Sequence, residues 1–229
     1  LAGDPRTWNM TLYRLRKAGK LSSAVPTTRI DRFDWNDCDE YLFASEIALQ
    51  SMLEKGAKSL DEVLCDPGLA TEFDRIAERY APGFLPLNYR WAALKLRKEA
   101  RNARSRAEVL RVPDRLGDPI RIDDARSMQE YAEGSGIYIV SNEKSRFYVR
   151  EALDLRRRLE GKFKTADQKE LWRERTGSEE LHLQFFRPDS STNQLIAWQA
   201  KFAMVYKTPF NLRIGAIGDE AESNAQTDI

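Results

Sequence analysis

The spacing of hydrophobic positions changes within thirty residues in the second half of the chain. Two short runs, Gly136–Val140 and Phe147–Val149, are rich in β-branched and aromatic residues, and the turn-forming stretch Ser141–Ser145 separates them. This pattern predicts a β-hairpin. From Glu151 onward the period becomes helical. The apolar positions that mark the predicted helix are Ala152, Leu155, Leu159 and Phe163.

The remaining elements are predicted from the same patterns and from their capping residues. In the front half we expect a short basic helix within residues 1–21 and helices over 34–55, from Ser59, over 68–80 and over 88–110. In the back half we expect a lead-in helix at 124–132, a helix at 165–175, a strand at 181–186 and a helix at 194–206.

Together these elements predict an α+β chain. We expect an all-helical domain over residues 1–111, followed by a linker at 112–124 that is broken by proline and glycine. A small domain at 125–214 would hold a three-stranded antiparallel sheet flanked by helices. The polar residues 215–229 are predicted to form a disordered tail.

Composition narrows the class of protein. The chain has 229 residues, of which 41% are hydrophobic and 32% charged, and no apolar run approaches the roughly 18 residues of a membrane helix. Two cysteines are too few for a disulfide framework, and a single histidine excludes zinc sites built from several histidines. We therefore expect a cytoplasmic protein without a membrane partner.

Basic residues are concentrated in the helix that is predicted near the middle of the chain. Residues 88–111 carry eight basic and two acidic side chains, whereas the whole chain has a net charge of only +1. Such a helix favours a polyanionic partner, although a charged face can also be merely solvated. The candidate DNA contacts in this stretch are Arg90, Lys95, Arg97, Lys98, Arg101 and Arg104.

The hairpin and the helix after it resemble the GIY-YIG nuclease domain. The first signature is intact as Gly136–Tyr138, and the second reads Tyr148–Arg150, with arginine where the family has glycine. The helix around Leu155–Leu159 and the closing Pro209–Asn211 also match. The resemblance covers about Ala125 to Arg213, under half of the chain, and it implies that fold for the second domain.

The resemblance also implies roles for individual residues. In this family tyrosines help deprotonate the attacking water, an arginine ten positions after the second tyrosine neutralises the phosphate, and a glutamate holds one divalent metal ion. Here Tyr138 and Tyr148 take the first role and Arg158 the second. Mg²⁺ or Mn²⁺ would be the cofactor. Arg150, Arg156 and Arg157 are candidates for further phosphate contacts, and a place on the solvated surface is the alternative for each.

Two positions leave alternatives open. Gln199 stands where the family has its metal-binding glutamate, and a neutral amide is a poor ligand for Mg²⁺. The substitution could be engineered, catalysis could be lost, or Glu179 or Glu180 could supply the ligand instead. His182 lies on a predicted strand, where a structural and a catalytic role are both open.

The leading interpretation is an endonuclease that hydrolyses phosphodiester bonds in double-stranded DNA, in phage defence, restriction or mobile-element processing. One alternative is a DNA-binding protein with a degenerate nuclease fold and no turnover. Another is a helical protein-interaction module that delivers the nuclease-like domain to a larger assembly. The sequence leaves the DNA target and the oligomeric state open, a dimer being one option.

Overall fold

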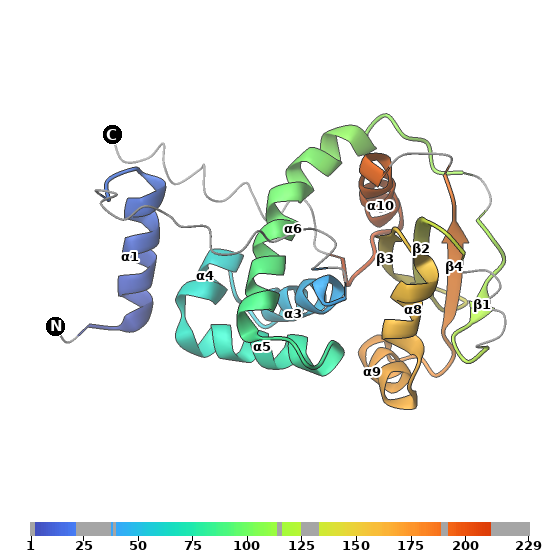
Figure 1. Cartoon of the computed structure of the whole chain (residues 1–229), viewed down its shortest axis with the longest axis horizontal. Coiled ribbons are helices and arrows are strands. Elements are labelled where there is room, and N and C mark those ends of the chain that lie inside the picture. Colours follow the sequence, from blue (N-terminus) through green and yellow to red (C-terminus); the bar gives the residue numbers. More distant parts are fainter. Residues whose placement is uncertain are drawn as a thin grey trace. The chain divides into compact units, whose positions relative to one another are not determined.

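The computed structural model describes residues 3–21, 38, 40–113, 116–124, 133–188 and 192–211. Within them lie eight helices and four strands (Figure 1). The helices are α1 (Pro5–Lys17), α3 (Leu42–Glu54), α4 (Leu60–Cys65), α5 (Pro67–Tyr80), α6 (Pro86–Ala107), α8 (Leu155–Phe163), α9 (Ala166–Thr176) and α10 (Thr192–Tyr206). The strands are β1 (Ile120–Arg121), β2 (Gly136–Ser141), β3 (Arg146–Ala152) and β4 (His182–Phe186). The chain is therefore a mixture of helices and an antiparallel sheet, in agreement with the predicted α+β class.

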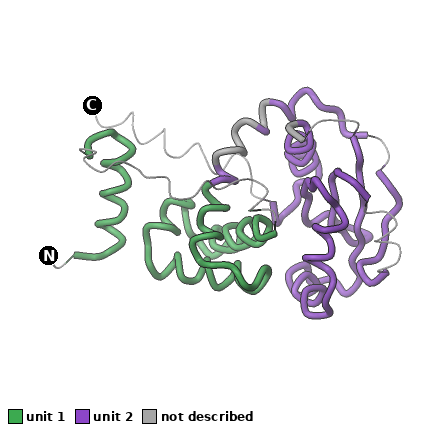
Figure 2. Tube along the Cα trace, viewed as in Figure 1, with its two compact units in different colours: residues 1–94 green, residues 95–229 purple. Residues whose placement is uncertain are grey.

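The chain divides into two compact units, Leu1–Leu94 and Lys95–Ile229 (Figure 2). The division falls inside α6, so this long helix contributes its first turns to one unit and its last turns to the other. The expected domain bounds at residues 111 and 125 stay predictions. Each unit is described separately below.

Every secondary-structure element described in the first unit is a helix. α3 packs against α5, α5 against α4, and α4 against α1. The helix starts follow from local capping: the Ser59 hydroxyl accepts from the Glu62 N–H, and the Asp66 carboxylate accepts from the first N–H groups of α5. Both starts were predicted from the sequence. Residues 34–37, at the expected start of the helix at 34–55, lie outside the described residues, and α3 begins at Leu42.

The second unit is built on one antiparallel sheet with strand order β1-β4-β2-β3. Alternate residues of β2 face opposite sides. Ile137 and Ile139 pack with Val149 of β3 and with Leu195 and Phe202 of α10. The opposite face of β2 and β3 lies under α8 and α9 (Figure 1). The sheet is thus enclosed between helices, as predicted.

Gly136 is required by close packing at the start of β2. A Cβ atom there would lie 2.9 Å from the Phe186 carbonyl oxygen and 3.1 Å from Leu155 Cδ1. The Leu155 N–H donates to the Gly134 carbonyl, which holds the start of α8 against this strand. The glycine of the first signature therefore permits the approach of helix to sheet.

The structure corrects two predictions about this unit. The sheet has four strands, not three, because Ile120 and Arg121, in the expected linker, pair with Leu183 and His182 of β4. The helix predicted from Glu151 begins only at Leu155. Its expected first residues continue strand β3 instead, and Ala152 pairs with Gly136.

Two other predicted features fall mostly or wholly outside the residues that the structure describes. The lead-in helix at 124–132 falls almost entirely on residues 125–132, and the tail at 215–229 falls within 212–229; both stretches lie outside the described residues. Among the described helices, none is long and apolar enough to cross a membrane.

Candidate active site

Two tyrosines share the face of the sheet that lies under α8 and α9. Tyr138 pairs with Arg150 and Tyr148 with Val140, so the two phenols are diagonal neighbours across β2 and β3. Their ring centroids are 6.2 Å apart, and neither side chain has exposed surface. Tyr148 also packs on Trp172 of α9. The structure thus brings together the two tyrosines that were assigned to water activation.

Sequence analysis missed a third group at this face, the ammonium of Lys162. Its Nζ donates a hydrogen bond to the Tyr138 hydroxyl and lies 4.6 Å from the centroid of that ring. The distance to the Tyr148 ring centroid is 5.8 Å. Lys162 is only 2% exposed, so a charge on it would be weakly screened by water. Its position four residues after Arg158, on the same helix face, was the available signal.

Arg158 occupies the turn of α8 just before Lys162. The helix begins at Leu155, whose first turn is capped by the Asp154 carboxylate, and its sheet-facing stripe is buried. Leu155 lies against Gly136 and Lys162 against Tyr138, so Arg158, between them on that stripe, faces the sheet. Burial lowers the pKa of the Arg158 guanidinium to about 9, which still leaves a cation at neutral pH.

The arginine in the second signature is buried rather than superficial. Arg150 lies within β3 and is 1% exposed, and its Nη2 is 3.2 Å from the Glu151 carboxylate, which is also buried. Glycine is not needed for a turn at this position because the strand continues for two more residues. Forming a buried ion pair of this kind costs desolvation energy. Removing one partner strongly destabilises the fold, because it leaves the other charge buried without compensation.

Gln199 of α10 lies at the edge of β3. Its Oε1 accepts a hydrogen bond of 3.3 Å from the Glu151 N–H. The predicted metal position is therefore next to a residue that does carry a carboxylate, although that carboxylate pairs with Arg150. No group of three or more His, Cys, Asp or Glu residues suited to a metal ion occurs among the described residues. Of the two alternative ligands, Glu179 and Glu180, the second pairs with Arg121 of β1 at 3.1 Å.

The closing Pro-x-Asn stretch completes the outer edge of β3. The Asn211 side chain accepts from the Val149 N–H and donates to the Val149 carbonyl, both at 2.8 Å. The Phe210 N–H donates to the Phe147 carbonyl. An edge strand normally exposes these backbone groups. This segment therefore replaces a missing neighbouring strand, which explains an asparagine at this position without any catalytic role.

His182 is separated from the tyrosines. It pairs with Ser141 at the far end of β2, and the neighbouring pair of the same face is Gln184 with Ile139. The tyrosines lie on the opposite face, where Phe185 pairs with Tyr138. His182 Nε2 is 3.9 Å from the Glu180 carboxylate. The structure therefore does not bring His182 to the proposed catalytic groups.

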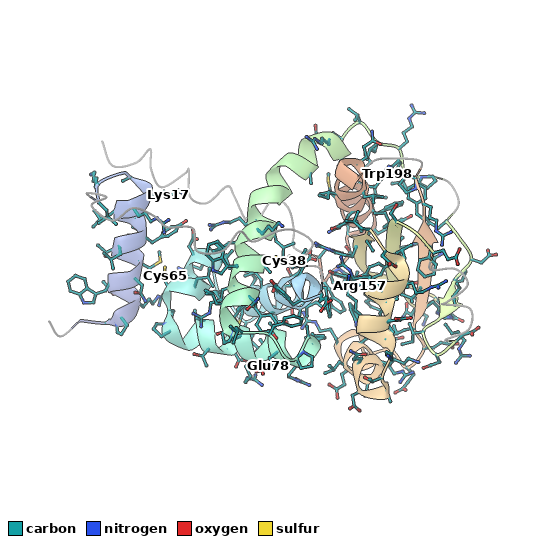
Figure 3. The ribbon with its side chains drawn as sticks, viewed as in Figure 1. Lys17, Cys38, Cys65, Glu78, Arg157 and Trp198 are labelled. Carbon is teal, nitrogen blue, oxygen red and sulfur yellow. The ribbon has the colours of Figure 1, made fainter. Side chains whose placement is uncertain are left out.

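The predicted DNA contacts are distributed over both units. Arg156 and Arg157 are exposed on α8 (Arg157 is labelled in Figure 3), and Arg156 pairs with Glu133 at 3.0 Å. Arg90 is engaged by Asp74, whose carboxylate accepts from its Nε at 3.0 Å. Lys95 and Arg97 are partly exposed. The side chains of Lys98, Arg101 and Arg104 lie outside what the structure describes.

Comparison with known proteins adds no relative. No protein-family model, curated protein or solved structure matches the chain. A function is therefore inferred from the sequence motifs and from the arrangement of side chains.

Proposed function

We propose that the second unit is the catalytic part of a DNA endonuclease of the GIY-YIG kind, and that Gln199 strongly reduces its turnover with Mg²⁺ or Mn²⁺. The observation that carries the proposal is the hydrogen bond from the buried Lys162 ammonium to the Tyr138 hydroxyl, beside Tyr148 and on the same helix face as Arg158. Phosphodiester hydrolysis needs a base for water and cations for the phosphoryl oxygens.

Lys162 gives Tyr138 a role that an isolated strand tyrosine lacks. An adjacent cation favours the charged form of an acid, so Lys162 would favour removal of the Tyr138 proton, against the cost of placing charge at a buried site. A phenolate can then accept a proton from an attacking water molecule. Arg158, one helical turn away, supplies a second cation for the negative charge that develops on the phosphate. Because both phenols are fully buried, a phosphate reaches them only after the covering side chains move.

The residues at the expected metal position do not fit a divalent cation as they stand. Gln199 offers a neutral oxygen that already accepts from the Glu151 N–H, and the Glu151 carboxylate pairs with Arg150. Mg²⁺ prefers anionic oxygen ligands. We therefore derive no step through a metal ion for this chain, and this misfit is the reason for proposing reduced turnover.

The full burial of both phenols and the misfit at the metal position favour one alternative, a phosphodiester-binding unit that no longer cleaves DNA. Its surface cations, Arg156 and Arg157, would still contact DNA, while the buried tyrosines would stabilise the fold. DNA binding that is independent of divalent metal, together with no cleavage by any variant, would distinguish this alternative from the endonuclease.

The catalytic assignment is tested by single substitutions in whichever form of the protein cleaves DNA. Tyr138→Phe, Lys162→Met and Arg158→Ala should each lower the cleavage rate by about 10²-fold or more, as the loss of one charge-stabilising group does. DNA affinity should change little because these groups act on charge that develops during the reaction. Rates and affinities would be measured by single-turnover cleavage and by anisotropy.

Lys164→Gln serves as the control, since it removes an exposed charge just after α8. A loss of affinity equal to the loss of rate in the three test variants would assign those residues to structure or binding alone.

A further prediction concerns DNA contact by α6. Replacing Arg97, Arg101 and Arg104 with glutamine should flatten the dependence of log affinity on log salt by about two to three units, if all three touch phosphate. The three positions share one helix face, and glutamine is compatible with a helix. Binding to a labelled duplex would be measured from low to high salt. An unchanged slope with unchanged melting would leave α6 as a solvated or protein-docking helix.

A further inference from the structure

A polar pocket opens beside the β2–β3 hairpin, on the sheet face opposite the tyrosines. Its volume is about 330 Å³, at the lower end of the range of small-molecule sites in proteins. Basic side chains line it from two directions, Lys144 and Arg146 from the hairpin and His182 from β4. None of these three residues belongs to the proposed endonuclease site. His182 was a candidate catalytic residue in the sequence, but it lies on the opposite face of the sheet from the tyrosines.

The hairpin that carries the two cations is held in shape by Asn142. The Asn142 Oδ1 accepts from the N–H groups of Lys144 and Ser145 at 2.9 and 2.7 Å, and its Nδ2 donates to the Ser178 hydroxyl. The Arg146 guanidinium lies 4.2 Å above the centre of the Tyr206 ring, a cation–π contact with α10. The basic groups are therefore presented by an ordered turn.

The charges around the pocket favour an anion. Lys144 and Arg146 are cations, and the single acid of the lining is Glu143. Glu180 lies 3.9 Å from His182 and also pairs with Arg121 at 3.1 Å, so this acid outside the lining is already engaged by a cation. Ser141 and Ser145 add hydroxyl donors to the lining. Guanidinium, ammonium and hydroxyl donors together match the oxygens of a phosphate group.

We propose that this pocket binds a phosphate monoester, either the terminal phosphate of a nucleic-acid strand or the phosphate of a mononucleotide. A terminal phosphate carries up to two negative charges and interacts with two cations more strongly than an internal phosphodiester does. A pocket also admits a chain end more readily than a continuous backbone. The proposal is independent of cleavage at the tyrosine face.

The test uses the full chain and calorimetric titration with inorganic phosphate, a mononucleotide, and short single-stranded oligonucleotides with 5′-phosphate, 3′-phosphate or hydroxyl ends. We expect the phosphorylated ligands to bind at least about tenfold more tightly than the hydroxyl-ended strand, the scale of one charge-assisted hydrogen bond. Lys144→Gln should remove most of that advantage. Lys144 is exposed on a turn, so the variant is expected to fold normally. Arg146→Gln tests the second cation.

Lys164→Gln is the matched control, an exposed lysine outside the pocket lining. Tight binding of a phosphorylated strand that is lost in Lys144→Gln supports a nucleic-acid end as the source, whereas binding of the mononucleotide alone supports a free nucleotide. Equal affinity for phosphorylated and hydroxyl-ended ligands would overturn the proposal. So would a phosphate preference that survives both Lys144→Gln and Arg146→Gln.

Discussion

Gln199→Glu is expected to raise Mg²⁺- or Mn²⁺-dependent DNA cleavage by about three orders of magnitude or more. The change supplies an anionic oxygen at the position where the neutral amide now accepts from the Glu151 N–H. Each tenfold change in rate corresponds to about 1.4 kcal/mol of barrier, so the expected gain corresponds to about 4 kcal/mol. Loss of an anionic metal ligand is a sufficient cause for an effect of that size.

The geometry around Gln199 makes a second readout available. A glutamate has nearly the same shape, so one carboxylate oxygen can keep the hydrogen bond to the Glu151 backbone while the other is free for a cation. The new charge also lies beside the residue whose carboxylate pairs with Arg150. We expect Mg²⁺ to raise the melting temperature of the variant more than that of the parent chain, since a ligand that binds only the folded state stabilises it.

Plasmid and single-stranded DNA would be incubated with each protein over a range of metal concentrations, and melting would be followed in parallel. Gln194→Glu is the control because it adds the same charge at an exposed position earlier on α10. If Gln199→Glu binds DNA normally and cleaves nothing with any divalent cation, either the alignment of α10 with the family or the endonuclease proposal is wrong.

Asn211→Ala is expected to lower the free energy of unfolding of the second unit by about 2 to 6 kcal/mol. Asn211 is 3% exposed and makes two hydrogen bonds of 2.8 Å with the backbone of Val149. Alanine leaves the N–H and the carbonyl of that edge residue buried without these partners, and each such group costs about 1 to 3 kcal/mol. The estimate treats the two losses as additive.

Urea unfolding followed by tryptophan fluorescence would measure the effect, and amide hydrogen exchange at Val149 would locate it. Thr208→Val is the matched control, since it removes only the 2.7 Å hydrogen bond from the Thr208 hydroxyl to the Asn211 Oδ1. It should cost about 1 kcal/mol. If Asn211→Ala lowers the free energy of unfolding by less than Thr208→Val does, Asn211 is not the group that closes the strand edge.

Local features were readable from the sequence because neighbouring residues determine them. The hairpin turn depends on the Asn142 side chain and the next three residues, and α9 begins with a reciprocal cap between Thr165 and Gln168. The alternating pattern at 181–186 predicted the strand that the structure shows as β4. The hairpin, the helix at 165–175 and this strand were predicted because they require no knowledge of distant contacts.

The tertiary structure alone decided the features that join distant segments. The Lys162 ammonium meets Tyr138 across 24 positions, Gln199 meets the Glu151 backbone across 48, and Asn211 meets Val149 across 62. Periodicity shows which face of an element is apolar but not which partner covers it. For the same reason β1 was not predicted. A strand of two residues is too short to show an alternating pattern, and it forms only because β4 offers an edge for pairing.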